Sequence, residues 1–280
     1  MKICCFSLFL SLFVFWVSGI SGQEPLRIAS YNIRVDSPGD GENIWANRKE
    51  RVKALIRFHD FDLFGIQEGL SYQVQDLAGL SEYGHYGVGR DDGEMKGEIM
   101  AIFYRKERLE MLDQGTFWLS ETPDVPTKGW GAGHYRTCTW AKMRDKATDK
   151  EFYFFNTHLD HRIPAARIGG VKLIGERIAA IVGDRYPVIC TGDFNAGPES
   201  EPILMMKTFL RSSRDVTADP PYGSQGTFFG FKIGGQPTDE IDYIFVNDKV
   251  EVLRYGVLAD SDGEYYPSDH HPVLIRAVLE

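Results

Sequence analysis

Short runs of apolar residues recur along the chain, and most are bounded by Gly, Pro, Asp or Asn. They are rich in β-branched and aromatic residues, which is typical of strands in a packed sheet. The predicted strands are Leu26–Ile33, Phe61–Ile66, Ile99–Tyr104, Leu109–Phe117, Tyr135–Met143, Phe152–Leu159, Pro187–Thr191, Ile241–Val246, Val250–Leu258 and Pro272–Val278.

A few segments repeat apolar residues with the period of a helix. In Asn47–Phe58, Val52, Leu55 and Ile56 fall near one face, and arginine and lysine fall on the other. The predicted helices are Asn47–Phe58, Tyr72–Leu80, Ile163–Val182 and Pro202–Leu210. Because the strands outnumber the helices and do not alternate strictly with them, we expect α+β architecture, with sheets packed on each other and helices outside.

The first residues differ from the rest. Lys2 precedes an apolar run from Ile3 to Val17, and small residues follow up to Gly22. This order is typical of a secretory signal peptide, and the apolar run is short for a membrane span. We expect residues 1–22 to be a cleaved signal, with an uncleaved anchor or a buried helix as alternatives. The mature protein, one domain from residue 23 to 280, is then secreted or periplasmic, with no transmembrane segment.

Charge and cysteine content narrow the possibilities. The formal net charge is −9, with 31 Lys and Arg against 40 Asp and Glu. Affinity for long nucleic acid depends on basic residues that neutralise its phosphates. The sequence shows no basic footprint of this kind, which disfavours such a partner. Beyond the predicted signal only Cys138 and Cys190 remain, which we expect to be buried free thiols, with a single disulfide as the alternative. We expect a monomer.

Polar clusters follow or interrupt six of the predicted strands. They contain acids, amides and histidines, and they are Ser30–Arg34, Gly65–Glu68, Asn156–Asp160, Thr191–Asn195, Glu240–Ile244 and Ser268–Pro272. One such cluster alone is most simply a turn or a helix cap. Six in one chain indicate a site, because strand ends hold side chains with little mobility. Their carboxylate and amide oxygens suit Mg²⁺ or Mn²⁺, and they include no thiol.

In the order SYNIR, QE, NTHLDHR, GDFN, IDYIF and SDHHP, these motifs resemble the endonuclease/exonuclease/phosphatase superfamily. The resemblance extends over nearly the whole mature chain, from Leu26 to Val278. It implies a four-layer α/β/β/α sandwich of two packed, mainly antiparallel sheets. It also implies a metal-dependent phosphoesterase, with Mg²⁺ as the expected cofactor and Mn²⁺ as a substitute.

The resemblance assigns roles to the metal side of the site. Asn32 and Glu68 match metal-binding positions, and Asp269 matches an additional carboxylate on that side. Asp193 and Asn195 match the pair that positions the attacking water and contacts the phosphate or a second metal.

The histidines supply the acid–base chemistry. By the same resemblance, His158 matches a hydrogen-bond donor to the phosphate, His270 the general base, and Asp242 the acid that orients it. The residue types agree, since histidine titrates near neutral pH and a half-buried aspartate fixes its tautomer.

Three arginines are candidates for substrate contact. Arg34 stands where several nucleases of the superfamily carry an acid. This departure puts in doubt the additional metal contact that such an acid would make. Arg136 follows Gly133-His134-Tyr135, and Arg167 follows the histidine motif. A guanidinium presents a bidentate fork to phosphate, although each arginine has a structural ion pair as its alternative.

The leading hypothesis is therefore an exported, divalent-metal phosphoesterase that hydrolyses a phosphate mono- or diester. Its substrate is expected to be small or flexible: a nucleotide, a sugar phosphate, or an inositol or lipid headgroup. The alternative within the same chemistry is a secreted nuclease acting on DNA or RNA. The alternative from another class is a non-catalytic secreted binding module.

Overall fold

The computed structural model describes residues 24–232, 234, 237 and 239–280. The predicted signal peptide, residues 1–22, lies outside the described residues. Strands in chain order are β1 (Leu26–Asn32), β2 (Leu63–Gln67), β3 (Tyr83–Tyr86), β4 (Ile102–Arg105), β5 (Leu109–Trp118), β6 (Thr137–Asp145), β7 (Lys150–His158), β8 (Val188–Asp193), β9 (Arg211–Ser212), β10 (Tyr222–Gly223), β11 (Asp242–Val246), β12 (Val250–Val257) and β13 (Val273–Leu279). Helices are η1 (Pro38–Asn43), α1 (Trp45–Phe58), α2 (Ser71–Ala78), α3 (Pro164–Val182), α4 (Glu201–Phe209) and α5 (Ser213–Val216).

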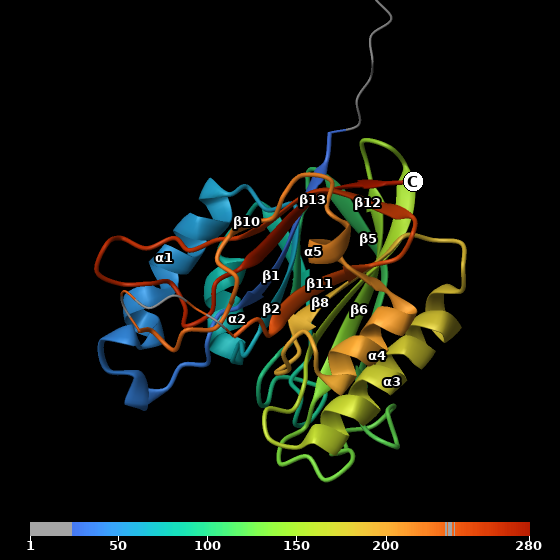
Figure 1. Ribbon diagram of the computed structural model, residues 1–280. Helices are drawn as coiled ribbons and strands as arrows, with labels where there is room; N and C mark the ends of the chain where they lie inside the picture. The colour runs from blue at the N-terminus through green and yellow to red at the C-terminus, as the bar shows by residue number, and fades with distance from the viewer. Residues whose placement is uncertain (1–23, 233, 235–236, 238) are drawn as a thin grey trace, which may run out of the picture.

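The strands form two mixed sheets that pack face to face (Figure 1). The first has the order β10-β12-β13-β1-β2-β4-β3, and the second has the order β5-β6-β7-β8-β11-β9. Most neighbours are antiparallel, but β1 pairs with β2, β7 with β8, and the two-residue β10 with β12 in parallel. In Figure 1, α1 and α2 lie on one outer side and α3 and α4 on the other. The expected α/β/β/α sandwich is confirmed.

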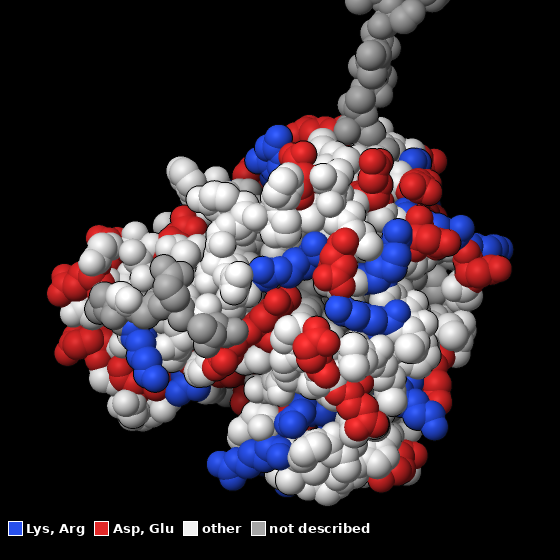
Figure 2. Space-filling view, viewed as in Figure 1, with Lys and Arg blue, Asp and Glu red and all other residues white. Residues whose placement is uncertain are grey.

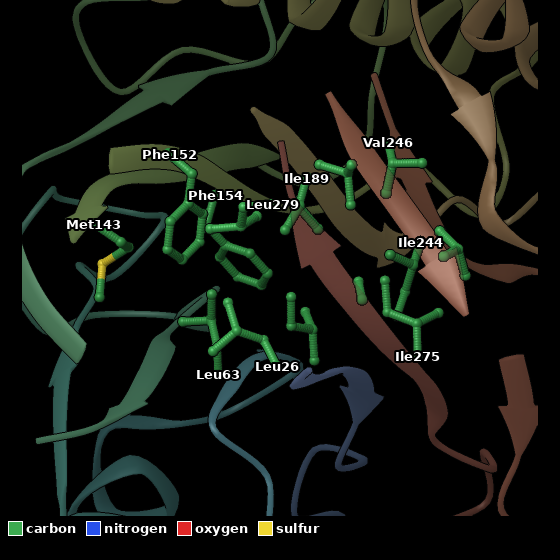
Figure 3. Packing of buried hydrophobic residues seen from close by; sticks show 14 of the residues in the cluster. Leu26, Leu63, Met143, Phe152, Phe154, Ile189, Ile244, Val246, Ile275 and Leu279 are labelled. Atoms are coloured by element: carbon green, nitrogen blue, oxygen red, sulfur yellow. The ribbon is translucent and has the colours of Figure 1, made fainter. Parts of the chain in front are cut away.

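Three apolar clusters hold these layers together. The central cluster lies between the sheets and includes Leu63, Phe152, Phe154 and Ile275, all fully buried (Figure 3). One outer cluster joins the first sheet to α1 and α2, and the other joins the second sheet to α3 and α4. Burying one large apolar side chain contributes roughly 1.5–3 kcal/mol, so the apolar faces of the helices and strands account for the layered packing.

A polar network also bridges the two sheets, close to the strand ends. The amide of Gln67 donates to Asn156 Oδ1 at 2.7 Å, and Thr191 Oγ1 lies 3.1 Å from the same oxygen. Gly65 permits this approach, since a Cβ there would fall 2.4 Å from the Asn156 side chain. Because satisfied buried polar groups rigidify a core, this network fixes the position of one sheet on the other.

Both cysteines of the described region are buried and free. Cys138 lies on β6 and Cys190 on β8, with β7 between them. Two strand spacings separate their backbones by about 9–10 Å, beyond the roughly 7 Å that a disulfide spans. The expectation of two free thiols therefore agrees with this geometry.

No helix among the described residues is long and apolar enough to cross a membrane.

Candidate active site

The topology brings the polar strand ends to one edge of the sandwich. The parallel strands β1 and β2 end at Asn32 and Gln67, and β7 and β8 end at His158 and Asp193. Strand β11 runs antiparallel to β8, so its first residue, Asp242, lies opposite Asp193. Side chains from both sheets therefore meet at this edge, as the sequence predicted.

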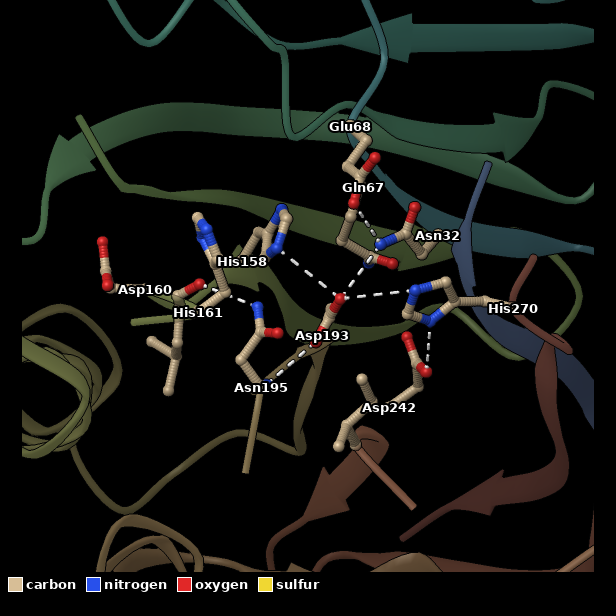
Figure 4. Close-up of polar contacts among 12 residues, drawn as sticks. Asn32, Gln67, Glu68, His158, Asp160, His161, Asp193, Asn195, Asp242 and His270 are labelled. Atoms are coloured by element: carbon tan, nitrogen blue, oxygen red, sulfur yellow. Dashed lines mark hydrogen bonds and ion pairs between the residues drawn. The ribbon is translucent and has the colours of Figure 1, made fainter. Parts of the chain in front are cut away.

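Asp193 lies at the centre of the cluster (Figure 4). Asn32 Nδ2 donates to Asp193 Oδ2 and to Glu68 Oε1, both at 3.0 Å. His158 Nε2 and His270 Nε2 lie 3.5 and 3.9 Å from the same Asp193 oxygen. Residues far apart in the chain thus surround one carboxylate.

His270 and Asp242 form a hydrogen-bonded pair. His270 Nδ1 donates to Asp242 Oδ2 at 2.8 Å, which leaves Nε2 facing Asp193. Thr227 Oγ1 donates to the same Asp242 oxygen at 2.5 Å and holds the carboxylate in place. Burial lowers the pKa of His270, but the Asp242 carboxylate outweighs it and raises this pKa to about 10. At this pKa the ring carries a proton on both nitrogens at neutral pH. Its hydrogen bond to Asp242 fixes its orientation, so that loss of one proton leaves Nε2, which faces Asp193, as the proton acceptor of the site.

The site is rich in negative charge and suits a cation. One ligand atom each from Glu68, Asp193 and His270 lies within 4.8 Å of the others. Burial and the neighbouring Asp242 raise the pKa of Asp193 to about 7. Burial also raises the pKa of Asp269, which lines the same pocket. Clustered carboxylates that resist ionisation are stabilised by a hard divalent cation, so these donors fit the expected metal.

The predicted metal ligand Asn32 is buried beside this set. Its Nδ2 faces the carboxylates of Glu68 and Asp193, while its Oδ1 accepts from the backbone N–H of Arg34 at 2.9 Å. In this arrangement Asn32 spaces the two carboxylates.

Arg34 does not offer a free fork to substrate. Its Nε and Nη2 each donate to Asp40 at 2.9 Å. Its Nη1 lies 3.9 Å from Glu68 Oε2, and its Nε lies 3.7 Å from Asp269 Oδ2. The guanidinium therefore offsets carboxylate charge at the site. The predicted phosphate contact of Arg34 is not what this geometry favours.

Arg167 lies outside the pocket. Its Nη1 donates to the backbone oxygen of Asp160 at 2.9 Å, near the start of α3. This is a structural contact, and the prediction that Arg167 binds substrate has no support from its position.

Arg136 differs from the other two arginines. Its side chain is only 6% exposed and lines the pocket, and Nη2 donates to His161 Nδ1 at 3.1 Å. Within the described part of the chain, its Nε and Nη1 have no hydrogen-bond partner. Asp160 Oδ2 is 4.0 Å from Nε, too far for a hydrogen bond. Buried donors without partners are costly, so these groups are candidates for contact with an anionic ligand.

Two loops add residues that the sequence reasoning did not assign. Segment 87–98 supplies Arg90 and Glu98, and segment 118–136 supplies His134. Arg90 Nη1 donates to Glu98 Oε2 at 2.6 Å, and this oxygen lies 3.7 Å from His158 Nδ1. Burial raises the pKa of Glu98 and lowers that of His158 well below its usual value. A neutral His158 can donate to a phosphate without adding charge.

Backbone strain concentrates around the pocket. Arg34, Glu68, Asn195 and Phe231 line it, and they have φ values of 60°, 65°, 48° and 59°. Such left-handed conformations cost about 1–3 kcal/mol each in residues other than glycine and cluster at functional sites. Asn195 also donates from Nδ2 to Leu159 O at 3.1 Å, and its N–H donates to Asp193 Oδ1 at 2.9 Å.

The pocket at this edge has a volume of about 510 Å³. This is the size of a small-molecule site. On the face that Figure 2 shows, acidic and basic side chains are interspersed. Neither feature favours a long polynucleotide.

Comparison with known proteins agrees with the geometry. The model of the Endonuclease/Exonuclease/phosphatase family matches residues 29–270. A mannosyl-6-phosphatase from Bacteroides thetaiotaomicron is 39% identical with a TM-score of 0.86, covering 91% of this chain and 100% of that one. An endonuclease/exonuclease/phosphatase from Bacteroides vulgatus is 42% identical with a TM-score of 0.87, covering 92% and 100%. The human nocturnin catalytic domain has the same fold at 19% identity and a TM-score of 0.73, covering 91% and 95%.

Proposed function

Because the chain belongs to the endonuclease/exonuclease/phosphatase family, we propose that this phosphoesterase is a divalent-metal-dependent phosphomonoesterase acting on a phosphorylated sugar. The expected metal is Mg²⁺, with Mn²⁺ as a substitute. The similarity to a mannosyl-6-phosphatase over the full length of that chain supports the sugar as the alcohol portion.

The buried guanidinium of Arg136, whose Nε and Nη1 have no hydrogen-bond partner among the described residues, carries the choice of a monoester. A terminal phosphate has three non-bridging oxygens and is close to a dianion at neutral pH, whereas a diester has two such oxygens and one charge. Charge-assisted hydrogen bonds from Nε and Nη1 therefore stabilise a monoester more strongly. Arg90, lining the same pocket, adds positive charge on that side.

The residues divide the reaction between them. His270 Nε2 accepts the proton of the attacking water, and Asp242 stabilises the imidazolium that forms. Asn195 and the neutral His158 stabilise the phosphoryl oxygens as charge builds up. Glu68 and Asp193 would hold a divalent cation, which would favour loss of the Nε2 proton from His270, polarise the phosphoryl group and offset charge on the leaving oxygen. The products are inorganic phosphate and the free sugar.

A substrate screen tests this proposal. Chelated protein is supplied with Mg²⁺ or Mn²⁺ and assayed on mannose 6-phosphate and on a matched set of phosphodiesters. We expect turnover of the monoester at least 100-fold above that of the diesters. Preferred turnover of diesters, or binding to polynucleotide that weakens steeply with salt, would instead indicate the nuclease.

The metal site has a test that does not use turnover. Calorimetric titration with Mn²⁺ is expected to detect binding to the unaltered chain, and Glu68→Gln is expected to weaken it by at least tenfold. Glu201→Gln, at an exposed residue of α4, is the matched control and should leave the affinity unchanged. Equal affinities in all three proteins would contradict the assigned ligands.

We also propose that residues 1–22 direct export and are removed. Mass spectrometry of the chain recovered from its producing cell is expected to find an N-terminus at residue 23.

A further inference from the structure

One wall of the pocket is aromatic, unlike the rest of its lining. Phe228 and Phe231 face the same space as Glu68 and His270. Elsewhere the lining is mainly charged or polar: Arg136 contacts His161, and Arg90, His158 and Glu98 lie close together. The pocket therefore has one side suited to phosphate and another suited to an apolar surface.

This aromatic wall is tied to the reacting groups. The backbone N–H groups of Phe229 and Gly230 donate to Asp269 O at 3.1 and 3.3 Å, and Phe228 forms a β-bridge with His270. The rings of Phe228 and His270 lie 4.9 Å apart. A ligand resting on this wall is thus held at a set position relative to the general base.

The Phe231 ring packs against the guanidinium of Arg48. The ring lies 5.7 Å from the guanidinium carbon of Arg48, which is buried and donates to the backbone oxygens of Ile33, Arg34 and Pro267. Phe231 also has a φ of 59°, a conformation that costs about 1–3 kcal/mol in a residue with a side chain. The Phe231 ring is half-buried and lines the pocket. Packing in the core therefore does not account for the strained backbone at this residue.

We infer that Phe228 and Phe231 form the subsite on which the pyranose ring of the phosphorylated sugar stacks. The inference rests on the proposed function and names the residues that select a cyclic sugar. A pyranose presents a face of C–H groups, and the face of an aromatic ring carries partial negative charge, so the two attract each other. The exocyclic phosphate then extends toward Glu68, His270 and Arg136.

Two substrates that differ in having a closed sugar ring measure the contribution of that ring to turnover. Methyl α-mannopyranoside 6-phosphate has a locked ring, and mannitol 1-phosphate is an open chain with a primary phosphate and several hydroxyls. The measured quantity is the ratio of kcat/KM for the first substrate to that for the second. This ratio does not depend on the fraction of a variant that folds, since both substrates meet the same active molecules.

We expect the unaltered chain to prefer the cyclic substrate, and Phe231→Ala and Phe228→Ala each to lower the ratio roughly tenfold. Phe231→Tyr keeps an aromatic face and is expected to retain most of the preference. Phe58→Ala is the matched control, because Phe58 is 81% exposed and lies outside this pocket. It should leave both activities unchanged.

Two results would overturn the inference in different ways. Turnover of both substrates with the same ratio in Phe231→Ala, Phe228→Ala and the unaltered chain removes the aromatic subsite and leaves the phosphatase intact. Failure of the unaltered, metal-supplied chain to hydrolyse either substrate removes the proposed function together with the subsite.

Discussion

Replacing Arg136 by methionine separates a substrate-binding arginine from a structural one. Methionine keeps an unbranched apolar chain and removes the two N–H groups, Nε and Nη1, that lack partners among the described residues. Each hydrogen bond to a charged group contributes about 1.5–3 kcal/mol. Loss of two such bonds to the phosphate is therefore expected to lower kcat/KM by about 10²–10⁴-fold.

The same change is expected to leave stability unharmed. The Arg136 side chain is 6% exposed, and burial lowers its pKa, so the free protein bears the cost of holding this cation out of water. Its replacement by an apolar side chain removes this cost together with the hydrogen bond to His161, so the free energy of unfolding is expected to change by less than about 2 kcal/mol. Lost activity combined with undiminished stability is characteristic of a group retained for its ligand.

The assay combines initial rates on mannose 6-phosphate with urea unfolding. Arg167→Met is the matched control, because Arg167 contacts the backbone of Asp160 and does not line the pocket. It should change kcat/KM by no more than about twofold. The reasoning is refuted if Arg136→Met loses several kcal/mol of stability, or if its kcat/KM falls by less than tenfold.

Three further predictions follow from the site and the core. His270→Ala is expected to lower kcat by about 10²–10⁴-fold in a chain that still folds, and near-normal kcat would exclude it as the base. Asp145→Asn is expected to cost about 2–4 kcal/mol at pH 7 by breaking a buried ion pair and hydrogen bonds. Despite burial, Arg108 and neighbouring donors lower the pKa of Asp145, so this stabilisation is present above about pH 4 and is lost as the pH falls through the folded pKa. Urea unfolding from pH 7 to 3 should show the two proteins converging, and a constant difference would contradict the assignment. Cys138 and Cys190, whose thiol pKa values burial raises, should resist alkylation until urea unfolds the chain; labelling of the folded protein would contradict their burial.

Most of the fold was predictable because its long strands and helices carry strong periodic patterns. All ten predicted strands and the four predicted helices appear, with ends shifted by a few residues. The missed strands β3, β9 and β10 have four, two and two residues, and each lies at a sheet edge or beside one. Such pieces are too short to show alternation, and they form because a neighbouring strand offers them backbone partners.

The core of the site was predictable for a topological reason. The positions of polar residues at the ends of buried strands are tightly constrained, since parallel neighbours end at the same edge of a sheet. Asn32, His158 and Asp193 therefore converge once β1, β7 and β8 take their places. Their catalytic roles stay predictions until the substitutions are measured.

The arginines and the aromatic wall show where this reasoning ends. Arg34 follows Asn32 by two residues, yet its guanidinium belongs to Asp40 in η1, a pairing that depends on how one loop folds back. Arg136 and Phe231 also lie on irregular segments, and the sequence alone does not place their side chains. The distinction between them comes from partners: Nε and Nη2 of Arg34 both donate to Asp40, whereas Nε and Nη1 of Arg136 are buried without a hydrogen-bond partner among the described residues. Because a buried donor without a partner costs more than a satisfied one, unsatisfied hydrogen-bonding capacity, more than proximity to the metal ligands, is the ground on which we propose Arg136 as the arginine that binds phosphate.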